Sequence, residues 1–203
     1  MLLKDHFELL SIYNQWMNSK LYEAASQLSD TELAKDRGAF FGSILGTLNH
    51  IMVGDIIWLK RLANHPACVS LLRETAGIEQ PTRLDQMLFK DLGRLSQQRT
   101  RLDSIIINWI DELSEDDLDV VLTYQNTQGV AANKRYSSLV YHFFNHQTHH
   151  RGQVSTLLLQ ADVDIGVTDL LALIPDESGA LGGIALINSR IGIPWMLRIN
   201  FGQ

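Results

Sequence analysis

Cysteine and positive charge are both scarce in this sequence of 203 residues. The single cysteine, Cys68, excludes an internal disulfide. Lysine and arginine together number 17 against 23 acidic residues, and the net charge of −6 gives no positive field that would attract a phosphate backbone. We therefore do not expect nucleic acid as a partner. The basic cluster of the chain is interleaved with polar and acidic residues and should form a solvated helix face: Lys90, Arg94, Arg99 and Arg101.

Long hydrophobic runs are also missing. The longest, residues 44–59, is interrupted by polar residues and is too short to span a bilayer. The opening segment MLLKDHFELL carries charges where a signal peptide needs an unbroken apolar stretch. We therefore expect a cytoplasmic protein with no membrane as a partner.

Apolar residues instead recur at helical spacing in four segments. Hydrophobic residues make up 45% of the chain, which is enough for one core of ordinary size. Steps of three and four between apolar positions predict helices over about residues 7–28, 41–62, 88–113 and 137–160. In residues 119–136, β-branched and aromatic residues flank a Gln-Asn-Thr-Gln-Gly turn, which predicts a small hairpin.

Together these elements predict an all-α fold, a four-helix bundle with a small hairpin between its third and fourth helices. The sequence changes character after Ile174 and Pro175, where apolar residues continue without a sustained period. We therefore assign residues 1–175 to the bundle. Residues 176–203 form a C-terminal extension whose structure the sequence does not assign.

Histidine is concentrated in the fourth predicted helix, within FNHQTHHRGQ (residues 144–153). His146 and His150 lie four residues apart in the apolar stripe, and His50 lies near the centre of the apolar second helix. Three neutral imidazoles converging from two helices would form a metal site with an open position. Spacing alone does not choose between the pair His142 and His146 and the pair His146 and His150. It fits equally well with core histidines that bond to carbonyl or carboxylate groups.

Two sequence blocks resemble the DinB family, also called the DinB/YfiT-like metalloenzymes. These blocks are LNHIMVGDIIWLKRL (48–62) and FNHQTHHRGQ (144–153), in this order and separation. The segments YNQWMN (13–18) and VTDLLALIP (167–175) fit the ends of the family. The resemblance covers about residues 1–175 and implies a four-helix bundle of the DinB/YfiT-like type that is frequently a homodimer.

The resemblance further implies a divalent metal ion held between the second and fourth helices. Carried over by motif, the metal ligands are His50, His146 and His150. His142 and His149 then become non-ligands, with His142 one turn before the first ligand of the fourth helix. Imidazole ligands suit several ions, so the expected cofactor is a divalent Zn, Ni or Fe ion of unassigned identity.

Helical position suggests roles for three neighbours of these histidines. Asp55 points about 140° away from His50, and we expect it to pair with a group such as Arg151 or with a backbone donor rather than with the metal. Gln153 is expected to make a helix-packing contact, with a reach into the site as the alternative. Gly152 is expected to permit close helix approach.

Three neutral ligands leave the charge of the metal uncompensated, which lowers the pKa of a bound water to roughly 7. Two enzyme mechanisms fit: hydrolysis by activated water, and transfer to a small-molecule substrate by the activated thiolate of a low-molecular-weight thiol. The resemblance favours the second, because some relatives are thiol-dependent transferases or isomerases. No carboxylate has the spacing of a general base, so the catalytic residues stay unknown.

Two other hypotheses remain open at the level of sequence. In one, the protein is a non-catalytic, stress-associated dimer in which the metal only ties the helices together. In the other, Cys68 is a catalytic nucleophile, although His65 is the only histidine near it in sequence.

Overall fold

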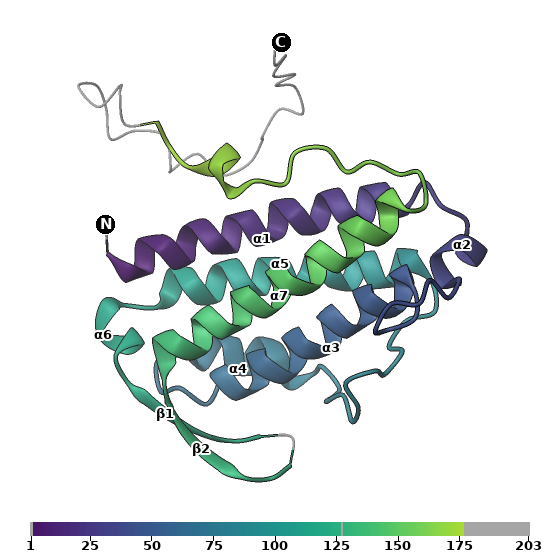
Figure 1. Ribbon diagram of the computed structural model, residues 1–203. Helices are drawn as coiled ribbons and strands as arrows, with labels where there is room; N and C mark the ends of the chain where they lie inside the picture. The colour runs from purple at the N-terminus through teal and green to yellow at the C-terminus, as the bar shows by residue number, and fades with distance from the viewer. Residues whose placement is uncertain (1, 127, 177–203) are drawn as a thin grey trace. The chain divides into compact units, whose positions relative to one another are not determined.

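The computed structural model describes residues 2–126 and 128–176, and the chain up to Leu173 forms one compact unit (Figure 1). The described residues are mostly helical with one small sheet. The long helices are α1 (Leu3–Ala25), α3 (Ile44–Leu62), α5 (Leu92–Glu112) and α7 (Tyr136–Leu159). The remaining elements are α2 (Asp30–Ala34), α4 (Val69–Ala76), α6 (Glu115–Leu118), the strands β1 (Val121–Gln125) and β2 (Ala131–Arg135), and a 3₁₀ helix (Leu170–Leu173). The predicted extension, residues 176–203, lies outside the described residues apart from its first residue.

Polar caps set the starts of two long helices that follow loops. The Ser43 hydroxyl accepts a hydrogen bond of 3.0 Å from the amide of Gly46 at the start of α3. The Asp91 carboxylate accepts one of 2.8 Å from the amide of Arg94 at the start of α5. Such caps satisfy amides that a helix leaves unpaired at its N-terminus. They explain why both helices begin a few residues later than apolar periodicity alone predicts.

The four long helices correspond to the four predicted ones and pack through their apolar stripes. Helix α1 lies against α5 and α7, and α3 lies against α7 (Figure 1). The largest fully buried side chains include Trp109, Tyr136, Phe7 and Phe143. Burying a side chain such as Phe7 contributes about 1.5–3 kcal/mol. Within the described ranges, no helix combines the length and hydropathy needed to cross a membrane.

The predicted hairpin is confirmed. Strands β1 and β2 pair antiparallel, with a register that runs from Val121 opposite Arg135 to Gln125 opposite Ala131. The second strand leads directly into α7. On the first strand, the ring of Tyr124 lies 5.6 Å from that of Trp58 on α3. The hairpin therefore packs against the helix that carries His50.

Charged side chains are buried between the long helices. The Arg99 guanidinium of α5 forms ion pairs with Asp55 of α3 and, at 2.9 Å, with Asp103. Asp103 also accepts a hydrogen bond of 2.8 Å from Asn18 of α1. The prediction that Asp55 pairs with a group such as Arg151 is therefore wrong, because its partner comes from α5.

Arg99 also corrects the prediction of a fully solvated basic face. Lys90, Arg94 and Arg101 are exposed as expected, but Arg99 is 2% exposed. It lies between Leu95 and Leu102 in the apolar stripe of α5, so helical geometry directs it inward. An isolated buried charge is costly, and here the two carboxylates compensate it.

Replacing Arg99 by Leu is expected to lower the free energy of unfolding by about 3–5 kcal/mol, because Asp55 and Asp103 would stay buried without their cation. Burial raises the pKa of Asp55 to about 6 although Arg99 lowers it, and the variant loses that lowering contribution. Between the ordinary pKa of the unfolded chain and the raised pKa of the folded chain, Asp55 is protonated only in the folded chain. Proton binding therefore stabilises the fold, and stability increases as the pH falls toward 4. Urea unfolding should therefore show a larger loss at about pH 8 than at about pH 5.

The exposed Arg101→Leu variant is the matched control, and its stability should change by less than about 0.5 kcal/mol. A loss smaller than about 1 kcal/mol for Arg99→Leu at both pH values would show that the buried ion pairs do not stabilise the fold.

Candidate metal centre

The site lies along the contact between α3 and α7, which run antiparallel. Every fourth residue of α3 therefore faces every fourth residue of α7, in the opposite order. His50 faces His150, with ring centroids 4.4 Å apart. One turn further along α3, Gly54 faces His146. After another turn, Trp58 faces His142, with ring centroids 4.8 Å apart. This seam brings one histidine of α3 together with the histidines of α7.

The structure brings together the three histidines that the resemblance implies as ligands. His50, His146 and His150 each offer a ring nitrogen, and these nitrogens all lie within 4.8 Å of one another. His50 and His150 are buried and His146 is half-buried. His142 and His149 are exposed, and neither joins the triad. The structure therefore groups His146 with His150, the pair that spacing alone did not single out.

Hydrogen bonds fix which nitrogen of two of these rings carries the proton. His50 Nδ1 donates a hydrogen bond of 2.8 Å to the carbonyl of Leu84, which can only accept. His150 Nδ1 donates one of 2.8 Å to Oε1 of Gln153. The Nε2 atoms of both rings are therefore unprotonated, with lone pairs free to bind a metal. Gln153 thus reaches the site, which was the alternative to the helix-packing role.

Burial lowers the pKa of all three imidazoles. For His146, burial and the neighbouring histidines lower the pKa to about 3. The pKa values of His50 and His150 are lowered as well, chiefly by burial. All three rings are therefore neutral at pH 7, the state in which histidine binds metals.

The donor set fits a divalent cation. The two unprotonated Nε2 atoms of His50 and His150 lie 3.1 Å apart, with no proton available to form a hydrogen bond between them. Two such lone pairs repel each other, and a cation between them removes the repulsion. Nitrogen ligands about 2.0–2.1 Å from a tetrahedral ion lie about 3.3 Å apart, close to this separation.

Gly54 makes the close contact between α3 and α7 possible. A Cβ atom at this position would lie 2.6 Å from Cε1 of His146, a separation that real Cβ atoms do not reach. The predicted close-approach glycine, Gly152, has no atom within 4 Å of the equivalent position. The prediction for Gly152 is therefore wrong, because that residue faces away from the contact.

Two further contacts of the site were not predicted. The ring of Phe41 stacks on His50, with centroids 3.7 Å apart and an angle of 16° between the planes. Leu84 contributes only its backbone carbonyl, from the loop between α4 and α5. A backbone acceptor leaves no signature in a sequence. Phe41 precedes the cap of α3, a position at which apolar periodicity carries no information about the site.

Cys68 lies in a second buried cluster that does not resemble an activated thiol. Its Sγ atom is 3.1 Å from the Tyr136 hydroxyl, which accepts a hydrogen bond of 2.9 Å from Trp109 Nε1. Burial raises the pKa of the Cys68 thiol, which opposes formation of a nucleophilic thiolate. The imidazole of His65 is also buried and lies 4.5 Å from the Tyr136 ring.

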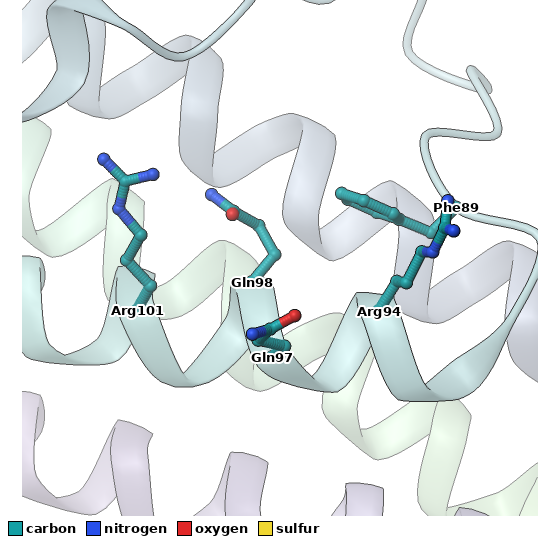
Figure 2. A pocket seen from close by; sticks show the side chains of 5 residues that line it. All are labelled: Phe89, Arg94, Gln97, Gln98 and Arg101. Atoms are coloured by element: carbon teal, nitrogen blue, oxygen red, sulfur yellow. The ribbon is translucent and has the colours of Figure 1, made fainter.

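A pocket of about 440 Å³ on the exposed side of α5 has a different character (Figure 2). Its lining consists of Phe89, Arg94, Gln97, Gln98 and Arg101. Figure 2 shows the two arginines at opposite ends of the row, with the glutamines between them. No histidine, thiol or carboxylate lines this pocket, so it offers neither metal ligands nor a nucleophile.

Comparison with known proteins assigns the family. The family model described as DinB family matches residues 2–177. The chain belongs to the DinB family. It is similar to Protein DinB of Bacillus subtilis (strain 168), with 25% identity over 157 residues that cover 77% of this chain and 87% of that protein. No solved structure gives a significant match to the chain.

Replacing Gly54 by Ala is expected to weaken metal binding at least about tenfold, because the added methyl group displaces the His146 ring from the triad. Circular dichroism should show an unchanged helical fold, since alanine is a better helix former than glycine. The affinity is measured by competition with a chromophoric zinc chelator.

The Gly152→Ala variant is the control, since its added methyl group meets no atom. It should bind metal as the wild type does and gain up to about 1 kcal/mol of stability. Equal affinities for the two variants would mean that the glycine contact does not position His146.

Proposed function

We propose that this DinB-family protein binds one divalent metal ion, Zn, Ni or Fe, through His50, His146 and His150, and that it is a metal-dependent enzyme. The reaction class is transfer to or from a low-molecular-weight thiol, with hydrolysis as the second possibility. The supporting framework is a four-helix bundle of the DinB/YfiT-like type formed by α1, α3, α5 and α7. Family membership and the geometry of the histidine triad support this proposal.

The facing lone pairs of His50 and His150 carry the proposal. Ordinary core histidines place a donor against an acceptor, because burial of an unpaired polar atom is costly. Here the Leu84 carbonyl and Gln153 hold the two Nδ1 protons on the outside, so that Nε2 meets Nε2. This arrangement is unfavourable without a cation and favourable with one. It matches the pattern in which outer hydrogen bonds orient metal-binding imidazoles.

The number of protein ligands favours an enzyme over a purely structural site. Within residues 2–126 and 128–176, no thiol or carboxylate joins the three histidines. Structural zinc sites use four protein ligands, whereas catalytic sites use three and leave a position for water or substrate. His146 is half-buried rather than enclosed, which supports access from solvent.

When bound, a divalent ion with three neutral ligands activates a water or a thiol at neutral pH by lowering its pKa. The residues of the chain hold the three imidazoles neutral and fix the tautomers of His50 and His150. Phe41, stacked on His50, shields that ligand from water on one side. Transfer to a thiol is the preferred reaction because an uncompensated positive charge favours an anionic fourth ligand such as thiolate.

The second candidate function is a non-catalytic dimer in which the metal only connects α3 to α7. The position of the ligands on these two helices favours it, because an ion between them would stabilise their contact. The homodimer itself stays a prediction from the family resemblance.

Elemental analysis after zinc loading and dialysis tests the proposal. We expect about one ion per chain in the wild type and background levels in the variants His50→Ala and His146→Ala/His150→Ala. Addition of β-mercaptoethanol to the cobalt-substituted protein should then produce a thiolate-to-cobalt absorption band, because the open position accepts the thiolate.

His6→Ala changes an exposed histidine on α1 and is the control; it should retain full metal content. Background metal in the wild type would overturn the proposal. Stoichiometric metal that no thiol reaches would instead support the non-catalytic dimer.

A further inference from the structure

A second group of side chains lies farther along the contact between α3 and α7, beyond His146. Trp58 and Arg61 of α3, Tyr124 of β1 and His142 of α7 lie together, and we call them the arginine cluster. The centroid of the Trp58 ring lies 4.8 Å from that of His142 and 5.6 Å from that of Tyr124. The His142 ring lies 6.1 Å from that of His146. The cluster is therefore continuous with the histidine triad.

Arg61 contacts two neighbouring aromatic rings. Its guanidinium lies over Trp58, 5.0 Å from the ring centroid, and 5.5 Å from the centroid of Tyr124. Contacts with ring faces hold the guanidinium in place while leaving its N–H groups free to pair in the plane. Both aromatic residues are half-buried, so the cluster remains in contact with solvent.

No carboxylate neutralises this arginine within the described parts of the chain. The ion pairs there engage other arginines, namely Arg37, Arg83, Arg94, Arg99 and Arg135. The side chain of Arg61 instead makes cation–π contacts with Trp58 and Tyr124. The neighbouring His142 adds no negative charge, and burial, together with the positive charge of Arg61, lowers its pKa. The cluster therefore presents a positive charge that no carboxylate of residues 2–126 or 128–176 neutralises.

The distance between the cluster and the triad suits a small molecule. Arg61 is seven residues beyond Gly54, or about 10 Å along the helix axis. Side chains of a helix lean toward its N-terminus, and the position of the guanidinium over Trp58 agrees with this direction. An anionic group paired with Arg61 would therefore lie less than about 10 Å from the level of His146 along the axis.

We propose that the arginine cluster is a subsite for the carboxylate of the thiol, with Arg61 as the specificity-determining residue. The carboxylate pairs with the Arg61 guanidinium while the reacting sulfur lies at the histidine triad. Tyr124 gives the hairpin a role, since this strand residue forms one wall of the subsite. This inference rests on the proposed metal site, and its test separates the two.

Two thiols of equal length, mercaptohexanoate and mercaptohexanol, test the subsite in the cobalt-substituted protein. We expect the wild type to bind the carboxylate thiol about tenfold more tightly, the ratio expected for one added charge-assisted pair. In Arg61→Met, whose side chain still covers Trp58, this preference should fall to about twofold or less. The affinity for mercaptohexanol should not change. Arg101→Met, on the exposed side of α5, is the matched control and should retain the preference.

Quenching of tryptophan fluorescence by iodide and by neutral acrylamide provides a readout that needs no metal. Iodide should quench the metal-free wild type more than Arg61→Met at equal ionic strength, whereas acrylamide should quench both equally. The other tryptophans contribute equally to both proteins, so the difference reports on Trp58.

Equal affinity for the two thiols in the wild type would overturn the subsite while leaving the metal site intact. If neither thiol changes the cobalt spectrum, the proposed function fails. The iodide measurement then tests separately whether Arg61 attracts an anion. Equal iodide quenching in the wild type and Arg61→Met would show that Arg61 attracts no anion and overturn the inference.

Discussion

The close antiparallel contact of α3 with α7 is the constraint on which the site depends. Gly54 leaves the space that the His146 ring occupies, and the same contact brings His50 to within 3.1 Å of His150 between their Nε2 atoms. The packing of the long helices against the buried apolar side chains provides the stability that holds two repelling lone pairs together. The electrostatic conflict at this contact is therefore a consequence of the fold, and a bound cation would resolve it.

The outer contacts decide what the triad can do. The Leu84 carbonyl comes from the loop that precedes α5, and Gln153 lies one turn after His150. Together they keep the Nδ1 protons away from the centre of the site, which aligns the metal-binding lone pairs before any ion arrives. Such preorganisation reduces the cost of ordering the ligands on binding. The Leu84 contact would also link the conformation of an exposed loop to the affinity of the proposed site for a metal.

Periodicity predicts the helical elements well because apolar stripes determine which faces are buried, and the hairpin follows from its turn sequence. The apolar stripe also predicts that His146 and His150 face inward, and the apolar neighbours of His50 predict its burial; His50 and His150 are buried and His146 is half-buried. Periodicity does not reveal the ion pairs of Arg99, because a partner of this buried charge comes from a helix distant in sequence. Sequence position alone does not show that Gly54, rather than Gly152 on the other helix, is the glycine at the helix contact. The Leu84 carbonyl was missed because a backbone acceptor does not depend on residue type.

X-ray absorption spectroscopy of the zinc-loaded protein tests whether the three histidines bind the metal. We expect three imidazole nitrogens at about 2.0–2.1 Å, with the outer-shell scattering typical of histidine rings, and one further light ligand. Replacing that ligand by a thiol should add a sulfur at about 2.3 Å. A first shell of oxygens without imidazole scattering would contradict the assignment of His50, His146 and His150 as the metal-binding residues.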